Sequence, residues 1–184
     1  MLLNGVRSSA GAERREEDDK EEPMTLSLRD SVHLVSDPRN LDASVHEVFE
    51  MMLGVDCVRE REPVHTEVDA VTAVVGFGGV LSGACVFRTS GPASMQMAAR
   101  MTGMEFEEVD DTVKDAVGEI CNMLAGSWKG RVPQLAANCG LSVPAVITGR
   151  NYKLHVQAPE FRLHHSYRFE EATFEVTIIC DGLQ

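Results

Sequence analysis

The sequence predicts an α+β fold, in which one mainly antiparallel sheet is covered on one face by long helices. Two observations lead to this class. Apolar residues recur at three- and four-residue spacing in several segments, as in amphipathic helices, and short segments rich in β-branched and aromatic residues follow them. Strands in meander order after helices favour a helical layer packed on an antiparallel sheet. With 184 residues, 43% of them hydrophobic, the chain can bury one sizeable core.

The start of the chain is predicted to be a disordered tail. Residues 13–22 form a mixed-charge run without an apolar face, so burial cannot offset the entropy that ordering would cost. The opening residues lack the long apolar segment of a secretory signal. We therefore expect a charged tail over residues 1–24 and a single domain over residues 25–184.

The first half of the domain is predicted to hold a helix and a hairpin. Residues 42–53 carry apolar side chains on one helical face, and Gly54 suits a C-cap. A strand is predicted to begin over residues 64–67. Residues 70–75 and 80–87 are predicted to be paired strands joined by a glycine-rich turn.

The uncharged run 71–87 has two other interpretations. A membrane span is disfavoured because the run is shorter than the ~20 residues that a bilayer needs. A phosphate-binding loop is disfavoured because the glycines are not followed by Lys-Ser/Thr, nor by a helix with an acidic partner for a ribose. Hairpin glycines explain the run better, and we expect no membrane segment.

Two more helices and a group of strands complete the predicted domain. Residues 90–103 begin with Ser-Gly-Pro and end in glycine, as a helix does. An aspartate at position 110 or 111 can cap a third helix that runs past Trp128 until Pro133 limits it. The remaining β-rich segments predict an antiparallel sheet over residues 141–147, 152–156, 163–169 and 173–180.

The composition excludes some classes of function. A formal net charge of −12 argues against a general nucleic-acid binder, which needs a basic face. The five cysteines are scattered and form no CxxC pair, so we expect reduced core residues in a cytoplasmic protein. The histidines show no metal-binding spacing, and the adjacent His164 and His165 would point to opposite faces of a strand. We expect no metal bound by this chain.

The most informative feature is a pair of polar residues in the third predicted helix. Glu119 and Asn122 are three positions apart, so they share one face of an otherwise small and apolar segment. Without further information, an exposed glutamate and a tolerated surface asparagine would be the ordinary interpretation. The alternative is that the two residues form a functional site that acts on a molecule bound at this face of the helix.

Over about residues 40–181 the chain resembles the CheX-like branch of the CheC/CheX/FliY phosphatases. The central match is an acidic residue, three residues, Glu, two residues and Asn, here Asp115, Glu119 and Asn122, followed by Met-Leu-Ala-Gly-Ser-Trp-Lys. Three other segments resemble the family's first helix, its glycine-marked hairpin and the segment that closes its sheet, namely residues 45–52, 75–83 and 141–149.

The resemblance implies an activity and a partner. The family dephosphorylates CheY-like response regulators, whose receiver domain holds Mg²⁺ and an active-site lysine, so this chain needs no cofactor of its own. Asn122 would position the attacking water, Glu119 would pair with that lysine, and Asp115 would belong to the docking face. Two-site CheC members carry a second ExxN motif on the first helix, and its absence here implies one site per chain and a CheX-like homodimer.

Two alternatives to catalysis remain open at this point. The same fold could be a non-catalytic domain that docks a response regulator or a flagellar-switch component. A weaker alternative is a redox sensor that uses Cys121, although no histidine or arginine stands nearby in sequence to lower its pKa.

Overall fold

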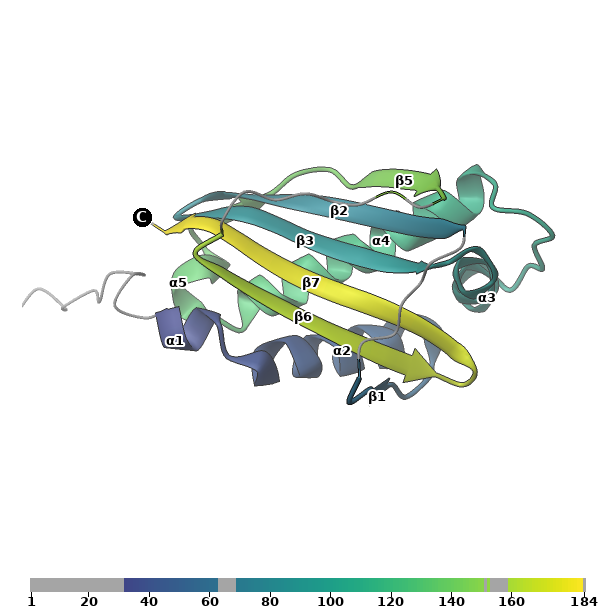
Figure 1. Cartoon of the computed structure of the whole chain (residues 1–184), viewed down its shortest axis with the longest axis horizontal. Coiled ribbons are helices and arrows are strands. Elements are labelled where there is room, and N and C mark those ends of the chain that lie inside the picture. The colour runs from purple at the N-terminus through teal and green to yellow at the C-terminus, as the bar shows by residue number, and fades with distance from the viewer. Residues whose placement is uncertain (1–31, 63–68, 151, 153–158, 184) are drawn as a thin grey trace, which may run out of the picture.

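The strands form one antiparallel sheet, and the helices α2 and α4 lie side by side against one of its faces (Figure 1). The computed structural model describes residues 32–62, 69–150, 152 and 159–183. This arrangement confirms the predicted α+β class. The strands are β1 (Val58–Arg59), β2 (Ala70–Gly79), β3 (Leu81–Ser90), β4 (Cys139–Leu141), β5 (Ala145–Gly149), β6 (Phe161–Phe169) and β7 (Ala172–Leu183).

Several helix ends lie at the capping residues that the sequence suggests. The Asp110 side chain accepts a hydrogen bond from the Val113 amide, at 2.9 Å, and so caps the longest helix. The glycines after α2 and α3 adopt left-handed conformations, as C-caps do. The first long helix begins earlier than predicted, because Asp37 caps it and Pro38 opens it. The helices are α1 (Val32–Val35), α2 (Pro38–Leu53), α3 (Gly91–Thr102), α4 (Asp111–Gly130) and α5 (Pro133–Ala136).

The uncharged run 71–87 forms most of the β2–β3 hairpin, as predicted. None of the helices within the described ranges is long and apolar enough to cross a membrane. The later strands do not make a separate meander, because β7 pairs with β3 on one side and with β6 on the other. The sheet order is therefore β1-β6-β7-β3-β2-β4, with β5 also paired to β2.

The prediction of one strand over residues 141–147 is wrong. Two strands, β4 and β5, pair with β2, and Ser142, Val143 and Pro144 separate them. Proline has no N–H to donate to a ladder, which favours a break at this point. The predicted tail over 1–24 and the predicted strand over 64–67 lie outside the described residues. So does the segment 152–156 apart from Tyr152, which is not in a strand.

An aromatic cluster fixes α2 to the sheet. The ring of Phe49 on α2 stacks on Phe174 of β7 with centroids 4.3 Å apart, and it also contacts Phe87 and Phe169. Trp128, which the sequence leaves unassigned, is fully buried on α4 and lies 5.3 Å from the ring of Phe77. All five cysteines are buried and unpaired, as predicted for core residues.

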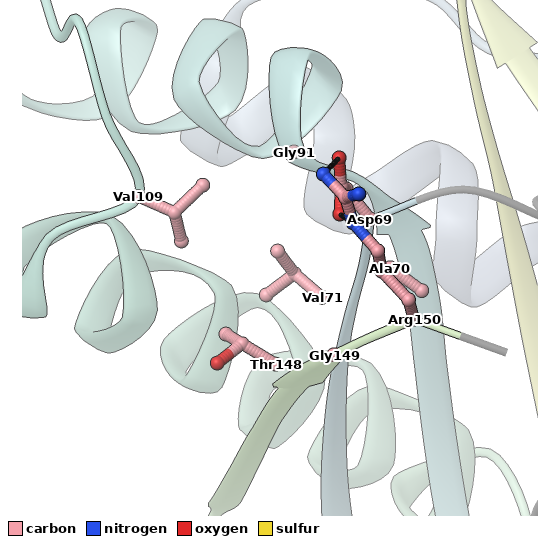
Figure 2. Close-up of a pocket in the computed structure, with 8 residues that line it drawn as sticks. All are labelled: Asp69, Ala70, Val71, Gly91, Val109, Thr148, Gly149 and Arg150. Carbon is pink, nitrogen blue, oxygen red and sulfur yellow. Dashed lines mark hydrogen bonds and ion pairs between the residues drawn. The ribbon is translucent and has the colours of Figure 1, made fainter. Parts of the chain in front are cut away.

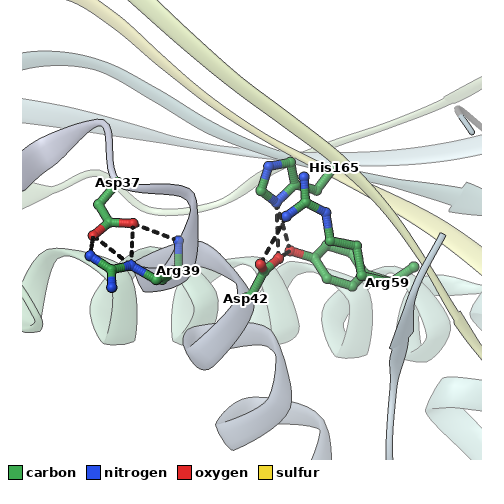
Figure 3. A network of polar contacts seen from close by, with 6 residues as sticks. Asp37, Arg39, Asp42, Arg59 and His165 are labelled. Atoms are coloured by element: carbon green, nitrogen blue, oxygen red, sulfur yellow. Dashed lines mark hydrogen bonds and ion pairs between the residues drawn. The ribbon is translucent and has the colours of Figure 1, made fainter. Parts of the chain in front are cut away.

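A polar network also joins α2 to the sheet. Asp42 on α2 accepts hydrogen bonds from the Tyr167 hydroxyl at 2.8 Å and from Arg59 at 3.0 Å, and His165 lies 3.0 Å from the same carboxylate (Figure 3). His165 is buried while His164 is exposed, which confirms that the two histidines face opposite sides of β6. Burial, together with the charge of Arg59, lowers the pKa of His165.

This lowered pKa predicts that acid destabilises the fold. An unfolded chain, whose histidine pKa is about 6.5, binds a proton at this position more readily than the folded chain does. The stability contribution of neutral His165 is therefore present above that pH and is lost as the pH falls through and below it. Urea unfolding from pH 7.5 to 5 measures the decline, and His165→Gln should flatten it. His46→Gln, on an exposed position of α2, is the control, and equal slopes for both variants would contradict the prediction.

Candidate active site

The helix α4 is rigidly seated in the core along one side. Its Cys121 thiol lies 3.5 Å from the Ala73 carbonyl on β2 and 3.6 Å from the Cys85 carbonyl on β3, so the helix crosses the central hairpin. A continuous buried face runs along the helix from its first turn to its last, and it comprises Val113, Ala116, Val117, Gly118, Ile120, Cys121, Leu124, Ala125 and Trp128.

The opposite side of α4 carries the residues that the sequence singled out. Asp115 and Glu119 are exposed and Asn122 is half-buried, and their four- and three-residue spacing places them in one row along the helix. None of the three side chains forms a hydrogen bond or an ion pair with another described residue. We call this row the polar stripe. It presents two carboxylates and one carboxamide that can bind an outside group, on a helix that is fixed in the core.

The neighbouring residues have structural roles. Cys121 is fully buried beside the pair, as expected for a small core residue, and it is not accessible as a redox sensor would require. The Lys129 ammonium donates to the carbonyls of Ala136 at 2.9 Å and Cys139 at 2.8 Å, so it holds the chain that follows α4. Neither residue points to a second chemistry at this helix.

A polar contact that joins α4 and the residue after it to α2 was not predicted from the sequence. The Ser127 hydroxyl donates to the Glu47 carboxylate at 2.7 Å, and Arg131 forms an ion pair with the same carboxylate. The hydrogen bond from Ser127 and the charge of Arg131 lower the pKa of Glu47. The sequence contains no local signal for this contact, because the residues are about 80 positions apart.

One cavity of the described chain is lined by residues other than those of the polar stripe. It has a volume of about 390 Å³ and is bordered by the start of β2, the end of β5 and the start of α3, with the ion pair between Asp69 and Arg150 at its edge (Figure 2). Its lining includes Val71, Val109 and Thr148 but neither Glu119 nor Asn122. Among the described residues no group of three or more His, Cys, Asp or Glu side chains could hold a metal ion.

Comparison with known families identifies the chain. A family model described as "Chemotaxis phosphatase CheX" matches residues 71–166, just over half of the sequence, including the polar stripe. The chain belongs to the CheX family. Among curated proteins, the CheY-P phosphatase CheX of Thermotoga maritima is 27% identical over 118 residues, which cover 62% of this chain and 76% of that protein.

Solved structures share the CheX fold. The chemotaxis protein CheX from Vibrio vulnificus aligns with a TM-score of 0.68 at 17% identity, covering 79% of this chain and 97% of that one. A CheX–CheY–BeF3–Mg²⁺ complex from Borrelia burgdorferi aligns with a TM-score of 0.63 at 19% identity, covering 78% and 97%. These structural matches confirm the predicted fold, and the family model confirms the resemblance to CheX.

The CheX-family chain has its ExxN pair on α4 alone. On α2 the corresponding stretch offers Glu47 and Glu50 without a following asparagine at the right spacing. Glu47 is moreover engaged by Ser127 and Arg131. The described part of the chain therefore presents one ExxN motif.

Proposed function

We propose that this protein accelerates hydrolysis of the phosphoaspartate on the receiver domain of a CheY-like response regulator. The observation that carries the proposal is the Glu119–Asn122 pair, an exposed glutamate and a half-buried asparagine without a hydrogen bond or ion pair to any described residue, on a helix whose other face is core. The curated relative is named a CheY-P phosphatase, and the Borrelia complex pairs a CheX protein with CheY. Both names support the same class of substrate.

The location of the pair favours a protein substrate. Enzymes that act on small molecules enclose them in concave, mostly apolar pockets. Here the pair lies on the outer side of a helix, and the described cavity of about 390 Å³ is lined by other residues. A macromolecule that brings its own half of the active site can use such a surface.

Asn122 would orient the water molecule that attacks the phosphoaspartate. Phosphoryl transfer needs little covalent help from the protein, so an in-line water and stabilised charge are enough. A carboxamide can accept a hydrogen bond from the water and donate one to a phosphoryl oxygen. The partner would contribute its own Mg²⁺ and lysine, and this chain needs no bound cofactor.

Glu119 would fix the register of docking. A carboxylate one helical turn from Asn122 can pair with the partner's active-site lysine. Asp115, one turn before it, would extend an acidic docking face that complements a cation on the partner. The lack of described internal partners for either carboxylate supports this role.

The proposal is tested with receiver domains from the same genome, each phosphorylated with acetyl phosphate. We expect the wild-type protein to accelerate phosphate release from at least one of them well above its own rate. Binding without acceleration would instead favour the non-catalytic docking domain. If the protein neither binds nor accelerates any receiver domain of the panel, the proposal is contradicted.

The substitution Glu119→Gln is expected to raise KM for the phosphorylated receiver domain and to lower kcat/KM about 10-fold or more, because it removes one member of a charge pair that orients the complex. Steady-state phosphate release measures both constants. Glu50→Gln, at an exposed position of α2, is the matched control and should behave as wild type. Equal kinetics for the two variants would exclude the pairing role.

We also propose that the protein is a cytoplasmic homodimer. Five buried, unpaired cysteines suit a reducing compartment. Within the described chain, β5 pairs with β2 on one side and with no strand on the other, so a second copy could extend the sheet there. Sedimentation at micromolar concentration tests the dimer, and a monomer alone would contradict it.

A further inference from the structure

An exposed apolar side chain lies in the loop between β4 and β5. Val143 has 86% of its surface exposed, which is the largest exposed fraction among the large hydrophobic residues of the described chain. The loop consists of Ser142, Val143 and Pro144. The inference developed from it rests on the proposed function.

Two glycines of α4 place this loop next to Asn122. A Cβ atom at Gly118 would lie 3.4 Å from the Pro144 side chain, and one at Gly126 would lie 4.0 Å from the Leu141 side chain. Asn122 is four residues from each glycine, so it lies on the same line of the helix surface and between the two contacts. Ser142 and Val143 connect Leu141 to Pro144, so the loop passes beside Asn122.

The loop is held in place by hydrogen bonds to β2. The Ser142 amide donates to the Gly76 carbonyl, and the Gly76 amide donates to the Ser142 hydroxyl oxygen, both at 2.9 Å. The same hydroxyl donates to the Val143 carbonyl at 2.9 Å. Pro144 restricts the backbone further. A partner that contacts Val143 would therefore not have to order the loop first, and little conformational entropy would be lost.

We propose that Val143 is an anchor for the receiver domain and inserts among apolar side chains that border the partner's phosphorylation site. The position is continuous with the polar stripe, which supplies the charged part of the same contact. Interfaces commonly combine a buried apolar centre with a polar and charged surround. Asn122 would then lie between the apolar contact made by Val143, from which solvent is excluded, and the phosphoryl group of the partner.

The test measures the kinetics of the variants Val143→Ala and Val58→Ala on the receiver domain that the wild-type protein dephosphorylates. Val143→Ala is expected to raise KM about 10-fold with kcat unchanged, because two methyl groups leave the contact. Val143→Ile should retain wild-type KM. Val58→Ala, at an exposed valine on β1, is the matched control and should change neither constant. Affinity for the beryllofluoride-charged receiver domain should fall by the same factor as KM rises.

The outcomes separate this inference from the proposed function. Wild-type acceleration with an unchanged KM in Val143→Ala would overturn the anchor and leave the phosphatase proposal intact. Loss of dimerisation in Val143→Ala, with normal kinetics per chain, would also overturn it and assign the valine to a second copy of this protein. No acceleration by the wild type on any receiver domain would reject both proposals.

Discussion

Replacing Asn122 by alanine is expected to lower kcat for phosphoaspartate hydrolysis about 10²–10³-fold, which is the usual cost of removing one preorganised polar group at a transition state. The KM for the phosphorylated receiver domain should change little, because Glu119 and Val143 provide the docking contacts. Single-turnover release of phosphate from a labelled receiver domain measures the chemical step directly. The fold should be unaffected, since the Asn122 side chain makes no described internal hydrogen bond.

The matched control for this variant is Asn138→Ala. Asn138 is exposed after α5, and among the described residues its side chain donates only to the carbonyl of Gln134, so loss of that side chain should leave the kinetics unchanged. Both variants should unfold within a few degrees of the wild-type Tm. A fully active Asn122→Ala protein would show that the ExxN pair does not act in catalysis, and that the α4 surface serves docking alone.

Replacing Gly83 by alanine is expected to destabilise the fold by about 3–5 kcal/mol. Gly83 adopts φ of 157° where β3 meets β7, and a Cβ atom there would overlap the Ile179 carbonyl oxygen and lie 3.0 Å from its carbon. The pairing shifts at this point, because Asp181 is an extra residue on β7 between the partners of Ser82 and Gly83. Backbone cannot move aside as a flexible side chain can, so the two central strands must separate.

Urea unfolding of Gly83→Ala measures the loss, and Gly78→Ala is the control. Gly78 lies in the same hairpin on β2, is exposed, and has no atom within 4 Å of a Cβ placed on it. Its substitution should change the free energy of unfolding by less than about 1 kcal/mol. Comparable stability of the two alanine variants would mean that β7 tolerates displacement at the irregular pairing.

The sequence predicts the elements well where local chemistry determines them. Asp110, Ser90 and the glycines at 54 and 103 each cap a helix through contacts within a few residues, so the helix ends can be inferred from neighbours alone. Strand order is different. The pairing of β3 with β7 joins residues about 90 positions apart, and the alternation within each strand does not specify that partner.

The candidate site also combines features that local sequence determines with features that depend on tertiary packing. Helical spacing alone places Glu119 and Asn122 on one face, and the family resemblance gives that pair a meaning. The hydrogen bond from Ser127 to Glu47 and the contacts of Leu141 and Pro144 with α4 depend on tertiary packing, so no local pattern indicates them. The break at Ser142–Pro144 was missed because a run of β-forming residues conceals it.

The central position of β7 has a consequence for how the protein is made. This strand comes after all the others in the sequence, yet it lies between β3 and β6. While the ribosome is still translating it, the hairpin carrying β3 and the strand β6 have no shared neighbour, and each presents an open backbone edge to other nascent chains. The complete sheet can form only once residues 172–183 have emerged, so β3 and β6 are open to pairing with other chains until β7 is available.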